Sequence, residues 1–80
     1  MLATRDTTGF LVEDSLGSRV GRVEAPMYGN SPTRPDALAV RGRRRYGRHF
    51  IVPAGTIDAI DDATETISLQ VARRELRTFL

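Results

Sequence analysis

The chain contains no cysteine, no tryptophan and no lysine, and it has a single histidine. The absence of cysteine excludes disulfide scaffolds, thiolate nucleophiles and zinc ribbons. One histidine without any cysteine leaves almost nothing for a transition metal to bind. We therefore expect no metal site and no cofactor in this protein.

Long hydrophobic runs are also missing. The longest apolar stretch, residues 50–55, is far shorter than the roughly 20 residues that a spanning helix requires. Residues 1–6 lack the apolar core of a secretory signal. The sequence therefore predicts no membrane insertion and a cytoplasmic location.

The size of the chain limits what it can build. Its 80 residues, 40% of them apolar, suffice for one small domain that spans residues 1–80. So short a chain has a small core and marginal stability, which makes a large enclosed active site improbable. The formal net charge is +2, and arginine supplies all 12 basic residues.

Short segments with alternating apolar residues recur about every ten residues, separated by turn residues. This spacing predicts an all-β fold, a small and strongly bent antiparallel β-barrel or half-barrel of about six strands. A bend is expected near Gly21, because Val20 and Val23 are three residues apart and share a face only where the strand bulges. The proline-rich residues 25–36 predict a long loop.

Helical periodicity is confined to the C-terminus. Ala72, Leu76 and Phe79 fall on one helical stripe, which Leu80 extends. The pattern predicts a short helix over residues 72–79 that docks on the barrel or on a partner. The predicted core consists of the apolar strand residues Val12, Val20, Val23, Leu38, Val40, Phe50, Val52, Ile57, Ile60, Ile67 and Leu69.

Two runs of sequence resemble one known family. The run Val12-Glu13-Asp14-Ser15-Leu16-Gly17-Ser18-Arg19-Val20-Gly21-Arg22-Val23 resembles the opening hairpin of PRC-barrel domains. The later run Phe50-Ile51-Val52-Pro53, followed by Ile57, Ile60-Asp61 and Ile67-Ser68-Leu69, is similar to the strands that close that domain. The resemblance covers residues 10–69 and implies a small stand-alone PRC-barrel member.

The family occurs in very different settings, among them the H subunit of photosynthetic reaction centres and a maturation factor of the small ribosomal subunit. The resemblance implies a non-enzymatic module for protein interaction or assembly. Because one fold hosts many functions, it does not name the partner.

No set of residues in the sequence has the pattern of a catalytic site. His49 has no nucleophile or second ligand paired with it by any motif, and a structural role is favoured. The carboxylates at positions 58, 61, 62 and 65 lack the ligand order of a calcium loop and indicate a solvated turn. We therefore predict that the protein is not an enzyme.

The densest feature is basic. Five arginines fall within residues 41–48, and one tyrosine lies among them: Arg41, Arg43, Arg44, Arg45, Tyr46 and Arg48. Guanidinium groups bind phosphate and carboxylate, and a tyrosine ring stacks on unpaired bases. The segment therefore suggests an alternative function, an RNA- or ribosome-associated factor, unless its charges only keep the domain soluble.

Two apolar groups are candidate partner contacts. Met27 and Tyr28 lie in the predicted loop and suit an interface as well as a cover for the barrel end. The C-terminal residues Leu76, Phe79 and Leu80 offer apolar area that a small core does not fully cover. With strand edges left to protect, these features predict a homodimer in addition to a protein partner.

Overall fold

The computed structural model describes residues 6–29, 35–42 and 48–79 of the chain. These residues form seven strands and two short 3₁₀ turns. In chain order the elements are β1 (Leu11–Glu13), β2 (Arg19–Met27), β3 (Ala37–Gly42), β4 (His49–Pro53), η1 (Ala54–Thr56), β5 (Ile57–Asp61), β6 (Thr66–Leu69), η2 (Arg73–Glu75) and β7 (Arg77–Phe79).

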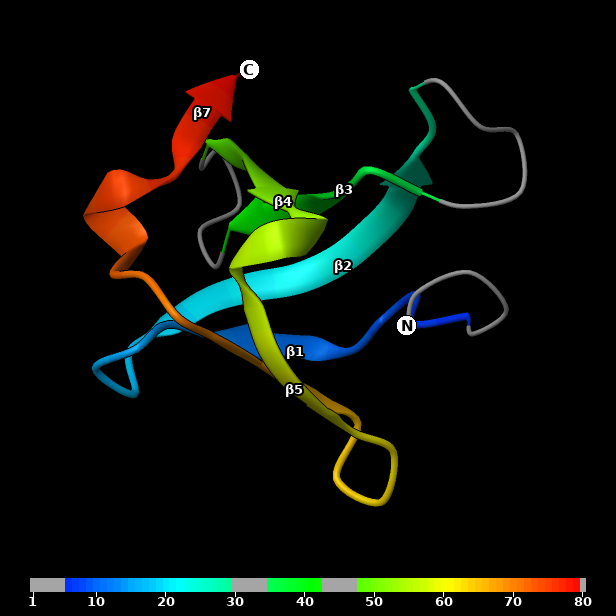
Figure 1. Ribbon diagram of the computed structural model, residues 1–80, viewed down its shortest axis with the longest axis vertical. Helices are drawn as coiled ribbons and strands as arrows, with labels where there is room; N and C mark the ends of the chain where they lie inside the picture. Colours follow the sequence, from blue (N-terminus) through cyan, green and yellow to red (C-terminus); the bar gives the residue numbers. More distant parts are fainter. Residues whose placement is uncertain (1–5, 30–34, 43–47, 80) are drawn as a thin grey trace.

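All seven strands belong to one twisted sheet with the order β5-β6-β1-β2-β3-β4-β7 (Figure 1). The predicted β-rich fold is confirmed. The prediction of a closed barrel is wrong, because within the described residues no pairing joins β5 to β7 and the sheet stays open. One pair, β1 with β6, is parallel where antiparallel pairing was predicted throughout. No helix among these residues has the length and apolar character needed to cross a membrane.

The long strand β2 organises the sheet, because it pairs with β1 on one side and with β3 on the other. In the ladder with β1, no residue lies opposite Val20, and in the ladder with β3, no residue lies opposite Glu24. Each irregularity adds one residue to β2 and bends the strand. The bend predicted near Gly21 is confirmed, and it allows Val20 and Val23 both to be buried.

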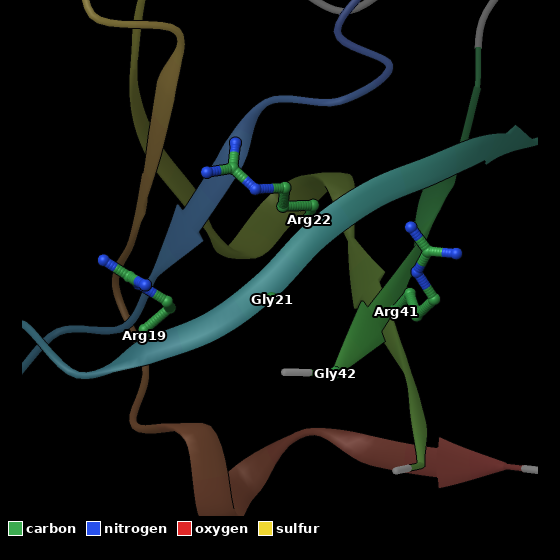
Figure 2. A pocket seen from close by; sticks show the side chains of 5 residues that line it. All are labelled: Arg19, Gly21, Arg22, Arg41 and Gly42. Atoms are coloured by element: carbon green, nitrogen blue, oxygen red, sulfur yellow. The ribbon is translucent and has the colours of Figure 1, made fainter. Parts of the chain in front are cut away.

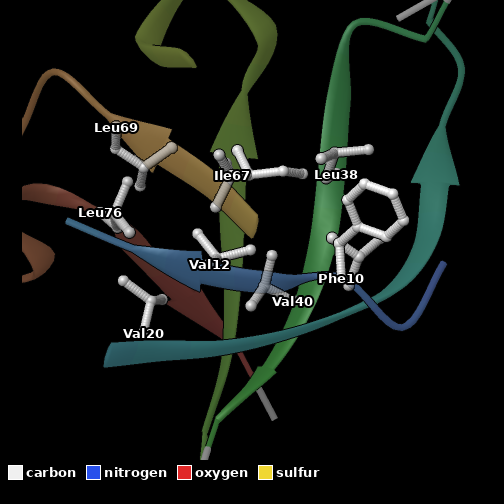
Figure 3. Packing of buried hydrophobic residues seen from close by; sticks show 10 residues of the cluster. Phe10, Val12, Val20, Leu38, Val40, Ile67, Leu69 and Leu76 are labelled. Atoms are coloured by element: carbon white, nitrogen blue, oxygen red, sulfur yellow. The ribbon is translucent and has the colours of Figure 1, made fainter. Parts of the chain in front are cut away.

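The core lies on the concave side of the bent sheet (Figure 3). Val12, Val40, Val52 and Ile67 have no exposed surface, and they come from β1, β3, β4 and β6. Residues of four strands thus meet in one cluster, which removes apolar surface from water. Its members are Phe10, Val12, Val20, Val23, Leu38, Val40, Val52, Ile67, Leu69 and Leu76.

Most of the predicted core is confirmed. Phe50, Ile57 and Ile60 differ, because they are only partly buried and pack against the edge of the cluster. Phe10 and Leu76 are core residues that the prediction left out. Leu76 was expected on an exposed stripe, but its exposed fraction is 8%.

The predicted helix at residues 72–79 is wrong. The segment forms the single turn η2 and then β7, which pairs antiparallel with β4. A helix of about eight residues is unstable in isolation, whereas pairing with β4 satisfies the backbone and suits the β-branched Thr78 and the aromatic Phe79. Burial of Leu76 anchors the segment on the core.

The predicted loop at residues 25–36 begins later than expected. Strand β2 runs through Pro26, which lies opposite Leu38 of β3, and ends at Met27. Beyond residue 29, only Pro35 and Asp36 of this segment are described. The amide of Asp36 donates to the carbonyl of Met27 at 2.9 Å and closes the segment.

Asp14 ties the β1–β2 turn to the distant η2 turn. Its Oδ1 accepts from the amides of Leu16 at 2.9 Å and Ser18 at 2.8 Å, and its Oδ2 accepts from the amide of Arg73 at 2.8 Å. The hydrogen bond from the Arg73 amide is the main cause that lowers the pKa of this carboxyl, against the effect of burial. The carboxylate form therefore stabilises both turns.

This network predicts a pH dependence of stability. The pKa of Asp14 is lower in the folded than in the unfolded protein, so its contribution is complete above its ordinary value of 3.8. It is lost as the pH falls below that value and through the lowered pKa. We expect Asp14→Asn to weaken the fold at neutral pH, because an amide nitrogen cannot accept from Arg73, and to flatten the acid limb of thermal stability.

The matched control is Asp6→Asn, because the pKa of Asp6 is also lowered, chiefly by the backbone amide of Thr8. That bond is local, with a length of 3.0 Å, and joins no distant segments. Melting temperatures between about pH 3 and pH 7 measure both effects. Equal losses at neutral pH in the two variants would contradict the role of Asp14.

Candidate anion-binding face

The arginine-rich segment at residues 41–48 is described only at its two ends. Arg41 is exposed in β3, and Arg48 is exposed directly before β4. Arg43, Arg44, Arg45 and Tyr46 lie outside the described residues. The structure adds two further arginines beside Arg41, both from β2.

Arg22 of β2 lies directly opposite Arg41 of β3 in the antiparallel ladder. Opposed residues of such a pair point to the same side of the sheet, so two guanidinium groups share one face. The next pair in the ladder is Gly21 with Gly42. The pair of opposed arginines therefore lies next to a pair of opposed glycines, which have no side chains.

These residues line an open pocket of about 380 Å³ together with Arg19. Figure 2 shows Arg19 and Arg22 extending from β2 and Arg41 extending from β3, with the two glycines between them. We call this surface the arginine face; it consists of Arg19, Gly21, Arg22, Arg41 and Gly42.

Among the described residues, no side chain neutralises the charges of the arginine face. In the part of the chain that the structure describes, no carboxylate pairs with Arg19, Arg22 or Arg41. The Nη1 of Arg22 donates to the carbonyl of Gly9 at 3.1 Å, which holds its guanidinium in place without cancelling the charge. Like charges directly opposite each other destabilise a sheet, so an anion placed between them would be favoured.

Gly21 brings the two strands of the arginine face together. A Cβ built on Gly21 would meet the backbone carbonyl of Arg41. A Cβ built on Gly42 would lie 2.7 Å from the carbonyl oxygen of Arg48. Close backbone approach therefore requires glycine at both positions.

His49 continues the same row across the sheet. It lies opposite Arg41 in β3 and opposite Phe79 in β7. Its Nε2 is 3.3 Å from Oε1 of Glu24, and its ring centroid is 5.3 Å from that of Phe79. The buried Nδ1 of His49 has no hydrogen-bond partner, and its structural role stays a prediction.

The predicted partner contacts have different positions. Met27 and Tyr28 are exposed at the end of β2, at 37% and 54%. Phe79 is 39% exposed beside His49, whereas Leu76 belongs to the core. Leu80 lies outside the described residues. The structure therefore removes Leu76 from the candidate contacts and keeps Met27, Tyr28 and Phe79 accessible.

The sequence prediction missed Arg19 and Arg22. Both are remote from Arg41 along the chain, and only the β2–β3 register brings Arg22 opposite Arg41. The sequence predicted both β2 and β3. Placing Gly21 opposite Gly42 would have placed Arg22 opposite Arg41. Among the described residues, no group of three or more His, Asp or Glu side chains is placed to hold a metal ion.

Comparison of the sequence with protein-family profiles and with curated proteins finds no match. The resemblance to PRC-barrel domains stays a prediction.

Proposed function

We propose that the protein is a non-enzymatic interaction module that holds an acidic partner protein on the arginine face. The observation that carries the proposal is the opposed pair of Arg22 and Arg41, which has no carboxylate partner within the described residues. Guanidinium groups bind carboxylates through paired hydrogen bonds, and arginine is enriched at protein interfaces. The resemblance to PRC-barrel domains supports the same class of function.

Exposed apolar side chains on β2 and β7 also support a protein partner. Met27 ends β2, the strand that carries Arg22, and Tyr28 follows it directly. Phe79 lies in the same cross-strand row as Arg41. Methionine, tyrosine, phenylalanine and arginine are the residue types that protein interfaces favour. This combination fits a partner that presents both carboxylates and apolar groups.

RNA is the second candidate partner, favoured by the rings beside the guanidinium groups. Phe79 and His49 are neighbours at a centroid distance of 5.3 Å, and His49 lies opposite Arg41. Single-stranded nucleic acids bind to basic surfaces on which aromatic rings stack against the bases. The sequence places Arg43, Arg44, Arg45 and Tyr46 directly after β3, which adds to this candidate.

The arginine face is tested by replacing one charge. We expect Arg41→Gln to weaken binding of a polyglutamate peptide by about tenfold to a hundredfold, because a charge-assisted hydrogen bond contributes about 1.5 to 3 kcal/mol. Arg74→Gln is the matched control, because it removes the same charge from an exposed position in η2. Titration by fluorescence anisotropy measures both, and equal losses would contradict a defined face.

Removal of the Phe79 ring distinguishes an acidic protein partner from RNA. Phe79→Ala removes a stacking platform, so it should weaken binding of a single-stranded RNA by about 1 to 3 kcal/mol and leave polyglutamate binding nearly unchanged. RNA binding should also fall by orders of magnitude between about 50 and about 200 mM salt. RNA binding with this sensitivity and no polyglutamate binding would favour the second candidate.

A further inference from the structure

The two ends of the open sheet carry opposite charge. The β7 end has three exposed arginines, Arg73, Arg74 and Arg77. The β5 end and the turn after it have four exposed acidic residues, Asp58, Asp61, Asp62 and Glu65. The one acidic residue at the β7 end, Glu75, accepts through Oε2 from the amide of Ala72 at 3.0 Å.

Both end strands have an outer edge that no strand covers among the described residues. β5 pairs only with β6, and β7 pairs only with β4. An uncovered edge presents backbone N–H and C=O groups that another strand can pair with. The sheet therefore offers one acidic edge and one basic edge.

We propose that β5 of one copy pairs antiparallel with β7 of a second copy, so that the protein assembles head to tail. The proposal does not depend on the arginine face. In the ladder of β5 with β6, no residue lies opposite Asp58, so regular pairing of β5 is confined to residues 59–61. This part has the same length as β7, which consists of three residues.

The antiparallel register makes the two edges complementary. It places Asp61 of one copy opposite Arg77 of the other. Opposite charges in such a cross-strand position attract each other. The other two opposed pairs are Ile60 with Thr78 and Ala59 with Phe79.

The burial patterns of the two edges also agree. In residues 59–61 the central side chain is half-buried and its neighbours are exposed, and residues 77–79 show the same order. Side chains alternate between the two faces of a sheet. The proposed pairing therefore continues each face of one sheet into the same face of the next.

Symmetric pairings are less favourable. Pairing β7 with β7 brings two sets of the three arginines together, and pairing β5 with β5 does the same with the acidic residues. Charged side chains on strand edges commonly prevent association. Such protection works with charges of the same sign on both edges, so it does not explain why one edge is acidic and the other basic. A head-to-tail contact leaves one free edge of each kind, so it extends into chains or closes into rings.

Sedimentation of the wild-type protein gives the first test. We expect a series of species larger than a dimer that grows between about 10 µM and about 1 mM, because an interface of three paired residues is weak. A monomer throughout this range, or a dimer that does not grow further, would overturn the proposal.

Single-charge variants give the second test. Asp61→Asn removes the charge but keeps an oxygen for the Ala63 and Thr64 amides that Oδ1 now accepts from, so the turn is retained. We expect Asp61→Asn and Arg77→Gln each to weaken assembly by about threefold or more. Asp58→Asn, at the skipped position, and Arg74→Gln, outside the strand, are matched controls that should have smaller effects.

Mixing of charge-reversed chains gives the decisive test. Asp61→Arg and Arg77→Asp should each abolish assembly alone, because like charges then oppose each other. An equimolar mixture should assemble again, because every β5 finds a β7 of opposite charge. Circular dichroism checks that both variants are folded. A mixture of two folded variants that stays monomeric, or an Asp61→Arg protein that still assembles alone, would refute the pairing.

Discussion

Ile67→Ala is expected to lower the free energy of unfolding by about 2 to 5 kcal/mol, a large part of the roughly 4 to 12 kcal/mol of a domain of this size. Ile67 has no exposed surface. It lies opposite Val12 in the parallel pair β1–β6 and opposite Ile60 in the antiparallel pair β5–β6. The cavity left by truncation is therefore enclosed on both sides by strands that have no room to collapse.

Leu16→Ala is the matched control, because it removes an aliphatic side chain that is 71% exposed in the β1–β2 turn. We expect a change within about 0.5 kcal/mol. Urea unfolding followed by circular dichroism measures both variants. Similar losses in both would show that the cluster around Ile67 is not the core of the protein.

The strands of this protein could be predicted because alternating apolar residues mark them directly. Leu38 and Val40 in β3 and Ile67 and Leu69 in β6 are two residues apart and buried, as the period of a strand requires. The bend in β2 was also predictable, because Val20 and Val23 cannot share a face in a regular strand. Local patterns therefore fixed most of the elements.

The C-terminal segment could not be predicted from its own pattern. The spacing of Ala72 and Leu76 fits a helix, but both residues are buried by a turn that docks on the sheet. The free edge of β4 then decides the conformation of β7. Tertiary context overrode local periodicity because so short a helix has little stability of its own.

The candidate site was predictable only in part for the same reason. Arg41 and Arg48 stand in a dense run of arginines that the sequence shows directly. The pairing of Arg22 with Arg41 depends on the β2–β3 register, and a skipped residue in β2 changes that register within the strand. Sequence alone does not specify where such a residue is skipped.

The second large effect is expected from Gly21→Ala, which should destabilise the protein by about 3 kcal/mol, the upper end of over-packing effects in proteins. The added Cβ would meet the carbonyl of Arg41, a backbone group that cannot rotate away. Relief requires β2 and β3 to separate, and these two strands form the longest ladder of the sheet.

Gly55→Ala is the matched control for this substitution. A Cβ at Gly55 meets nothing within 4 Å, and its backbone needs no left-handed conformation. Loss of chain freedom in the unfolded state should make this variant about 0.4 to 1 kcal/mol more stable. Thermal unfolding should therefore show that glycine-to-alanine substitution lowers the stability at position 21 and raises it at position 55.

The effect of Gly21→Ala on binding follows from its position between the arginines. Separation of β2 from β3 would move Arg22 away from Arg41, so a folded Gly21→Ala protein at low temperature should bind polyglutamate several-fold more weakly than wild type, although no charge has been removed. Gly55→Ala should bind like the wild type. A Gly21→Ala protein with unchanged stability would show that the close approach of the two strands at Gly21 is wrong. If Gly21→Ala lowers the stability as expected but leaves polyglutamate binding unchanged, the spacing of the arginine pair does not determine the affinity.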